Sequence, residues 1–308
     1  MWENCGKSGS IYAEISFKLP IASHTCGKTR GLNPLVITQK RTLRSMDLNS
    51  EVFMRLMTTS LPVGINELDR VIDDRFLKAR ECKAGVYEVL NFEHGGHILT
   101  AVRSALVTLS NTVHTDAKGN KQVRVTSTGV AGLLRIAFEG LANFRWLSDP
   151  DEPIELEARA FGVHFTQVYE AQKYYRDLGD TKALTKFTKL LNFEIEYGKT
   201  AGFLEEKLEK PGSYKCVGLA NIPDTTSLCR VIKVPESIVT DEVKAIYTGM
   251  RNGSFLYRWL SGNTHGMFWV NGFEEASDGK MTPKIPYLIL NLALETSLAE
   301  IRVLAQQL

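Results

Sequence analysis

The stretch TGVAGLLRIAFEGLANFRWL, residues 128–147, decides the fold class because it reads as a helix with neighbours on most of its sides. At about 100° per residue, its large apolar side chains cover an arc of roughly 200°, about twice that of an ordinary surface helix. These side chains are Val130, Leu133, Leu134, Ile136, Ala137, Leu141, Phe144 and Leu147. Such an arc is typical of the central helix of a bundle.

The remaining face of this stretch is a narrow polar stripe that contains Gly132, Arg135, Glu139 and Asn143. Arg135 and Glu139 are four residues apart, so their side chains can pair on a helix. Two interpretations are open. The pair is either a salt bridge on the one face that reaches solvent, or a buried arginine with its partner, facing an internal polar site.

The rest of the chain from about residue 46 also alternates helical periods with short polar breaks. The apolar periods predict helices at 47–59, 64–80, 84–115, 128–147, 153–178, 182–209, 240–264 and 285–307. Gly179 follows the fifth of these as a left-handed terminating residue. Strand signals are sparse, and residues 213–236 predict a short irregular or hairpin insertion. The fold class is therefore predicted to be all-α, a multi-helix bundle.

The composition is that of an ordinary soluble globular protein, with 44% hydrophobic and 23% charged residues among 308. No apolar run reaches the ~18–20 residues that a membrane helix needs, so we predict no membrane association. The five cysteines are widely spaced and form no CxxC pair. Reduced thiols fit this pattern, which favours a cytoplasmic location.

The N-terminal segment differs in charge from the rest of the chain. Residues 1–45 contain seven Lys and Arg against two acids, which leaves 30 basic and 33 acidic residues in the remainder. We predict a basic, poorly ordered tail over 1–45 and a single helical domain over 46–308. The pieces CGKS and CGKT in this tail lack the upstream glycine of a phosphate-binding loop, so no nucleotide cofactor is predicted.

A second polar stripe follows the predicted helix in TDEVKAIYTGMRNGSFLYRWLSGNTHG, residues 240–266. Its members fall within about 80° of one another on a helical wheel. They are Tyr247, Arg251, Ser254, Arg258, Ser261 and His265. The stripe is either a solvated face or a polar seam inside the bundle. A solvated face usually carries Lys and Glu rather than Tyr, Ser and His.

The segments RIAFEGLANFRWLSDP (135–150) and YRWLSGNTHG (257–266) carry a family resemblance. Residues 64–307 resemble an uncharacterised bacterial all-helical family, commonest in actinobacteria, that is similar to the HEPN superfamily. Active HEPN proteins cut RNA without a metal, using an Arg and a His separated by four to six residues. Arg258 and His265 have that spacing. HEPN sites usually form across a dimer, so the resemblance also implies a homodimer.

The resemblance implies that His265 transfers protons and that Arg258 stabilises charge on the phosphate. An imidazole titrates near neutral pH, and a guanidinium can neutralise a developing phosphate charge. With Arg135, Glu139, Tyr257 and Ser261 as binding residues, the predicted function is an internal polar site for a phosphate or RNA ligand, including metal-independent ribonuclease activity. The alternative is a non-enzymatic helical scaffold or dimerisation module, in which the same residues form a structural polar network.

Three further features of the sequence bear on metal and DNA binding. His94 and His97 could share a metal ion only with a third ligand, such as Glu139, Glu170 or His164. We predict no metal site and no cofactor. The run KLLNFEIEYGKTAGFLEEKLEK, residues 189–210, is interpreted as a solvated helix face because of its charge pairs. No basic recognition helix follows a helix–turn–helix pattern, so sequence-specific DNA binding is not expected.

Overall fold

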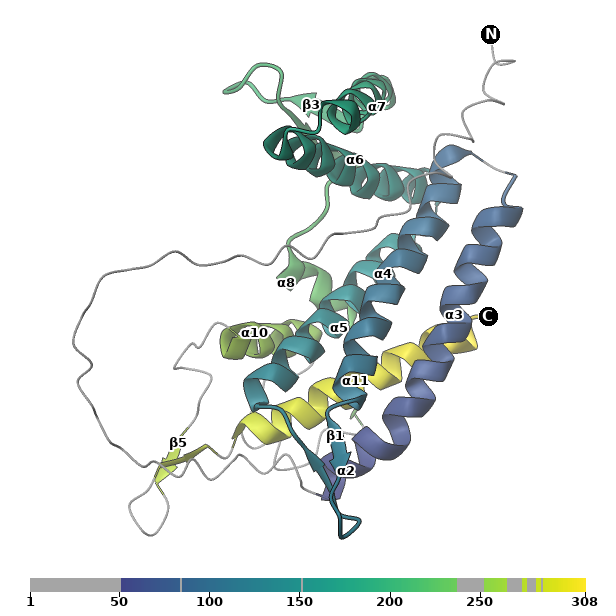
Figure 1. Ribbon diagram of the computed structural model, residues 1–308. Coiled ribbons are helices and arrows are strands. Elements are labelled where there is room, and N and C mark those ends of the chain that lie inside the picture. Colours follow the sequence, from purple (N-terminus) through teal and green to yellow (C-terminus); the bar gives the residue numbers. More distant parts are fainter. Residues whose placement is uncertain are drawn as a thin grey trace, which may run out of the picture. The chain divides into compact units, whose positions relative to one another are not determined.

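The computed structural model describes residues 51–83, 85–150, 152–236, 252–264, 273–275, 281–283 and 285–308. These residues form an all-α, multi-helix bundle with a few short hairpins, as predicted (Figure 1). The predicted N-terminal tail, residues 1–45, lies outside the described residues, as does most of the first half of the helix predicted at 240–264. No helix in the described part of the chain is long and apolar enough to cross a membrane.

The first helical segments form one continuous rod rather than the two separate helices predicted at 47–59 and 64–80. Helix α2 (Glu51–Arg55) passes through a π-helical turn, η2 (Leu56–Ser60), into α3 (Leu61–Glu81). The Leu61 N–H donates to the Leu56 carbonyl, which widens the turn by one residue. Pro62 follows this turn at the second position of α3, where it has no N–H to donate to a carbonyl of the preceding turn.

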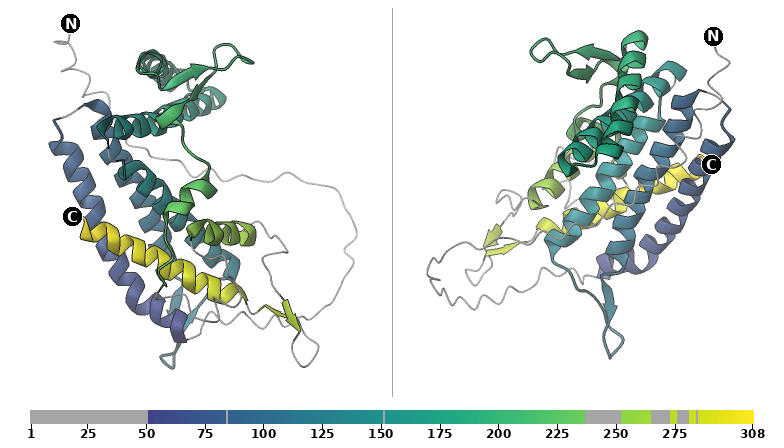
Figure 2. Two further views of the ribbon diagram at one scale, coloured as in Figure 1. Left: turned by 180° about the vertical axis from the view of Figure 1, so that it is seen from behind. Right: turned by 45° about the horizontal axis from the view of Figure 1, so that its top comes forward.

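Helix α5 (Ser127–Ser148) occupies the centre, as its apolar arc predicted. It contacts α4 (Val86–Ser110), α6 (Pro153–Leu178), α10 (Gly253–Thr264) and α11 (Ile285–Gln306). In Figure 1, α3, α4 and α5 lie side by side, and both Figure 1 and Figure 2 show α11 crossing them. The side chains between these helices form a largely aliphatic first cluster, which includes Leu99, Leu134, Leu256 and Leu294.

A second cluster packs α6 and α7 (Thr181–Ala201) against the beginning of α4. This cluster is rich in aromatic residues, among them Tyr87, Phe161, Phe165 and Phe203. Gly162 of α6 lies directly under the 3-10 turn η3 (Gly218–Ala220), because a Cβ atom at position 162 would be 2.1 Å from the Ala220 carbonyl oxygen. The segment after α7 is thereby held against α6.

Two helix ends differ from the prediction. Helix α4 ends at Ser110 rather than 115, and the chain enters the hairpin of β1 (Val113–Thr115) and β2 (Lys121–Val123). Helix α7 ends at Ala201 because Gly202 adopts a left-handed conformation, with φ 75°. Gly179 ends α6 in the same way, with φ 75°, which confirms the prediction for that residue.

The predicted insertion is present, but its hairpin begins earlier than residue 213. Strand β3 (Leu204–Glu206) pairs with β4 (Tyr214–Cys216), and the chain then runs through η3, α8 (Thr225–Leu228) and η4 (Cys229–Val231) without further paired strands in this described stretch. A third described hairpin joins β5 (Phe273–Glu275) to β6 (Met281–Pro283). The fold therefore places the two stretches that carry the polar stripes on α5 and α10, which contact each other.

Candidate functional site

The polar stripe of α5 meets Tyr257 of α10. The Arg135 guanidinium lies 5.7 Å from the centre of the Tyr257 ring, within the range of a cation–π contact. On its own helix, Arg135 Nε is 3.7 Å from Glu139 Oε2. The Arg135 side chain is 24% exposed and that of Glu139 is 35% exposed, so the pair is neither fully solvated nor fully buried. We call Arg135, Glu139, Tyr257, Arg258 and Ser261 the α5–α10 seam.

A close approach of backbones fixes α10 in this place. The Gly253 N–H donates to the Ile232 carbonyl over 2.8 Å at the start of α10. A Cβ atom at position 253 would lie 2.6 Å from both the Cys229 carbonyl oxygen and the Phe138 ring. Glycine is therefore what allows α10 to start against η4 and α5. Leu256 and Leu260 are fully buried behind it, which leaves Tyr257 and Ser261 half-buried.

The structure brings together some of the predicted site residues. Arg135, Glu139 and Tyr257 converge, and Ser261 lies one turn after Tyr257 on α10. Arg258 has an exposed side chain. His265 lies outside the described residues, as do Tyr247 and Arg251 of the same stripe, so the role of His265 stays a prediction.

Cys229 lies close to the seam and is not an activated nucleophile. Its side chain is fully buried at the start of η4. Burial, together with the nearby carboxylates of Glu139 and Asp224, raises the pKa of the thiol to about 12. The thiol is therefore protonated at neutral pH, whereas nucleophilic cysteines require a thiolate.

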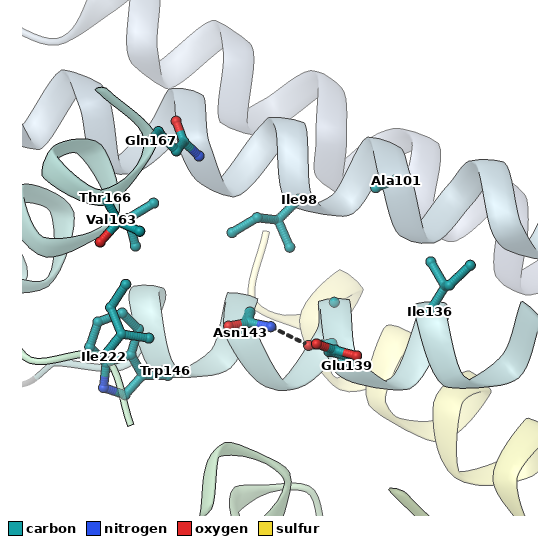
Figure 3. A pocket seen from close by; sticks show the side chains of 11 residues that line it. Ile98, Ala101, Ile136, Glu139, Asn143, Trp146, Val163, Thr166, Gln167 and Ile222 are labelled. Atoms are coloured by element: carbon teal, nitrogen blue, oxygen red, sulfur yellow. Dashed lines mark hydrogen bonds between the residues drawn. The ribbon is translucent and has the colours of Figure 1, made fainter. Parts of the chain in front are cut away.

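An apolar cleft opens on the other side of α5, between α5, α4 and α6 (Figure 3). It has a volume of about 440 Å³. Ile136, which the apolar arc placed in the core, is 51% exposed and lines this cleft, so that prediction was wrong for this residue. Glu139 and Asn143 also line it, and the polar stripe of α5 therefore borders both the seam and the cleft. We call this the α4–α5 cleft.

A buried polar network lies inside the second cluster. The Tyr87 hydroxyl donates to Glu194 Oε2 over 2.8 Å, and His164 Nε2 is 3.4 Å from Glu194 Oε1. The His94 ring stacks near that of His164, with centroids 5.5 Å apart. These residues come from three helices, α4, α6 and α7, and we call them the histidine network. Glu194 is 1% exposed, so the interpretation of residues 189–210 as a solvated face was wrong at this position.

Burial dominates the protonation of this region. Burial, together with the neighbouring His164 and His97, lowers the pKa of His94 to about 3. His94 is therefore neutral at physiological pH. The Tyr197 hydroxyl donates to Glu157 at the edge of the network, and burial together with this carboxylate raises the pKa of Tyr197 well above its usual value.

His94 and His97, which could share a metal ion only with a third ligand, contact different partners. His97 is exposed and packs edge-on against Phe76, with centroids 5.3 Å apart, while His94 turns toward His164 on α6. Of the third ligands considered, Glu139 belongs to the seam, and Glu170 pairs with Lys173 over 2.7 Å. In the described part of the chain, no three His, Cys, Asp or Glu residues are grouped so as to hold a metal ion.

A last polar cluster joins α5 to α11. Arg145 Nε is 2.9 Å from Glu300 Oε1 and 3.2 Å from Asp149 Oδ2. Burial raises the pKa of Glu300, which is 9% exposed, and the charge of Arg145 opposes this shift. This cluster fixes the crossing of two core helices and does not border the cleft or the seam.

Comparison with known proteins finds no relative of this chain: no family model, no curated protein and no solved structure matches it.

Proposed function

We propose that the α5–α10 seam binds a phosphate group of an RNA ligand. The observation that carries this proposal is the position of the Arg135 guanidinium, 5.7 Å from the Tyr257 ring centre and 24% exposed. Two segments that are more than a hundred residues apart in the sequence thus contribute to one partly exposed, cationic and hydroxyl-bearing surface. The resemblance of the same two segments to HEPN-like proteins supports RNA as the ligand.

The chemistry of the seam suits a phosphate. A guanidinium presents planar donors that match phosphate oxygens, and Glu139 restricts the orientation of Arg135. Arg258 adds a second, exposed positive charge one residue after Tyr257. In this proposal, Tyr257 and Ser261 donate hydrogen bonds from their hydroxyl groups, and His265 transfers the proton of a ribose 2′-hydroxyl. We further propose that the active form is a homodimer.

Fluorescence anisotropy with a labelled single-stranded RNA of mixed sequence tests the binding. We expect Arg135→Ala and Arg258→Ala each to weaken binding by roughly tenfold, as is typical for the loss of one charge-assisted hydrogen bond. Arg176→Ala is the matched control, since Arg176 is an exposed arginine, with a side chain 58% exposed, at the far end of α6. Equal affinity of all four proteins would contradict the proposal.

Cleavage is tested separately. Wild type and His265→Ala are incubated with the same RNA in the presence of EDTA, and the products are separated by size. Cleavage by the wild type alone supports metal-independent ribonuclease activity. Binding without cleavage by either protein leaves a binding function for the seam and excludes the nuclease part. Light scattering at several protein concentrations tests the homodimer.

A structural role for the seam is the second candidate, and the Arg135–Glu139 ion pair favours it. Partly buried pairs stabilise helices when both members stay in place, and removing one leaves a charge without its partner. If the seam is only a structural network, Arg135→Ala lowers the melting temperature by several degrees and no RNA binds to the wild type. Melting curves of the same variants therefore separate the two candidates.

A further inference from the structure

The α4–α5 cleft carries an inference that does not depend on RNA binding in the seam. The geometry points to a site for a small amphiphilic amine, whose apolar body lies along the cleft and whose positively charged head faces Glu139. Three features of the described residues support this assignment: the apolar walls, the negative charge of Glu139, and the size of the cleft.

The walls of the cleft suit an apolar body. Ile98 of α4 and Val163 of α6 face Trp146 of α5 and Ile222 of the segment after η3, as Figure 3 shows. Trp146 is held in place from outside the cleft, because the Arg159 guanidinium lies 5.6 Å from its ring centre and donates to its carbonyl over 2.6 Å. A wall that is already ordered loses little conformational entropy when a ligand binds.

The charge at the cleft favours a cationic ligand over an anionic one. Asn143 uses its amide N–H to donate to the Glu139 carbonyl over 2.8 Å, as drawn in Figure 3, and the Thr166 hydroxyl donates to Gly162 over 2.9 Å. Glu139 is the ionisable side chain among the described residues that line the cleft. Arg135 approaches one of its oxygens at 3.7 Å, but a carboxylate has about four acceptor positions. The charge of the cleft therefore comes from the Glu139 carboxylate, beside the neutral amides of Asn143 and Gln167.

The size of the cleft selects a small molecule rather than a partner helix. Its volume of about 440 Å³ lies within the ~300–1,000 Å³ of typical small-molecule sites. Val163, Thr166 and Gln167 of α6 and Ile222 line the cleft together with α4 and α5, as Figure 3 shows. At the floor, Gly140 lets α4 and α5 approach closely, because a Cβ atom at that position would be 2.4 Å from Val102 Cγ2.

Calorimetric titration of the full chain with octylamine, octanol and octanoate tests the inference, because these three probes share a chain and differ in the head group. We expect octylamine to bind at least about tenfold more tightly than octanoate, from the charge of Glu139. In Glu139→Gln, this preference should fall to within about threefold, as only a neutral acceptor remains. Ala101→Phe, which adds a ring to an exposed position in the cleft wall, should weaken all three probes.

A pair of exposed isoleucines provides the matched control. Ile136 in the cleft is 51% exposed and Ile154 outside it is 53% exposed. Ile136→Ser should weaken octylamine binding, whereas Ile154→Ser should leave it unchanged. The inference is overturned if octylamine binds no more tightly than octanoate, if its preference survives Glu139→Gln, or if no probe binds. The RNA affinity of these variants is measured in parallel, so a loss of amine binding in the cleft is distinguished from a loss of RNA binding in the seam.

Discussion

The two hydrophobic clusters are built from the same kind of helix but bury different chemistry. The first cluster, around α5, is mainly aliphatic, with fully buried leucines such as Leu99, Leu106 and Leu134. The second cluster, between α6, α7 and the start of α4, encloses aromatic rings together with His94, His164 and Glu194. The first cluster contributes stability that is independent of pH, whereas the second depends on protonation states and on completed hydrogen bonds.

This difference has a physical origin in helix composition. The arc of α5 has apolar side chains at nearly every inward position, and Arg145 meets Glu300 of α11 at the edge of this arc. Helix α7 has Phe187, Leu191, Glu194 and Gly198 on its buried face, so one inward position carries a carboxylate. A buried carboxylate requires hydrogen-bond donors. The Tyr87 hydroxyl donates to Glu194, and the His164 ring lies beside the same carboxylate. The second cluster is therefore the more easily perturbed of the two.

The largest expected effect is the loss of a side chain from the first cluster. Leu134→Ala removes a fully buried leucine from the central helix and should lower the free energy of unfolding by about 2–5 kcal/mol. Leu77→Ala is the control, because Leu77 is 50% exposed. Urea denaturation followed by circular dichroism measures both, and similar small losses would show that α5 is not the centre of the core.

Removing one hydroxyl oxygen from the second cluster should lower the free energy of unfolding. Tyr87→Phe keeps the ring but removes the donor to Glu194, which should destabilise the protein by roughly 1–3 kcal/mol, the cost of an unsatisfied buried polar group. Tyr174→Phe, at a position 46% exposed, should change the free energy of unfolding by less than about 0.5 kcal/mol. If the two variants unfold alike, the histidine network contributes no stability.

Acid should destabilise the second cluster before the first. The folded state lowers the pKa of His94 from 6.5 to about 3. Above pH 6.5 this residue is neutral in both the folded and the unfolded chain and costs no stability. As the pH falls from 6.5 toward 3, the unfolded chain takes up a proton that the folded chain does not, so the free energy of unfolding decreases. At pH 5.5 this group alone should reduce the free energy of unfolding by about 1.4 kcal/mol relative to pH 7.5. The measurement is urea denaturation at both values of pH, with His94→Gln as the comparison.

Two results would contradict this assignment for His94. One is an equal pH dependence of unfolding in wild type and His94→Gln. The other needs no variant: an NMR titration of the imidazole protons that shows His94 protonated at pH 5.5. The second measurement remains decisive if His94→Gln does not fold.

The smallest effect is expected for charges outside both clusters. Arg103 pairs with Asp69 across α4 and α3, but their side chains are 41% and 38% exposed. Arg103→Ala should therefore cost about 0–1 kcal/mol, and the cost should decrease in 1 M NaCl. Thermal unfolding at low and high salt measures it. A loss as large as that of Tyr87→Phe would mean that surface pairs stabilise this bundle as much as the buried network.

The sequence predicted the fold class and the central helix because both depend on local periodicity. The apolar arc of residues 128–147 is visible without any partner helix, and Gly179 marks a helix end by its own conformational preference. The exposure of Ile136 could not be predicted, because it depends on how α4 and α6 diverge beside α5. Arg135 and Tyr257 were both predicted as binding residues of one site, but their cation–π contact was not, because Tyr257 lies beside the polar stripe of its helix and not in it.

The histidine network was missed although one signal was present. Glu194 lies in step with Phe187 and Leu191 on the apolar face of its helix, which marks a polar residue at a core position. The charge pairs nearby led instead to a solvated interpretation of the whole run. Its partner Tyr87 is 107 residues away, and nothing in the sequence of either segment specifies that contact.

The π-helical turn at Leu56–Ser60 has a consequence for the length of the chain. A π turn contains one residue more than an α turn and leaves the flanking helical faces in phase. Deleting Thr59, which is exposed, together with Pro62→Ala would leave an uninterrupted α-helix, with Phe53 and Leu68 still directed toward the core. This rod is thus a place where the chain could lose one residue, with one accompanying substitution, without rebuilding the interior.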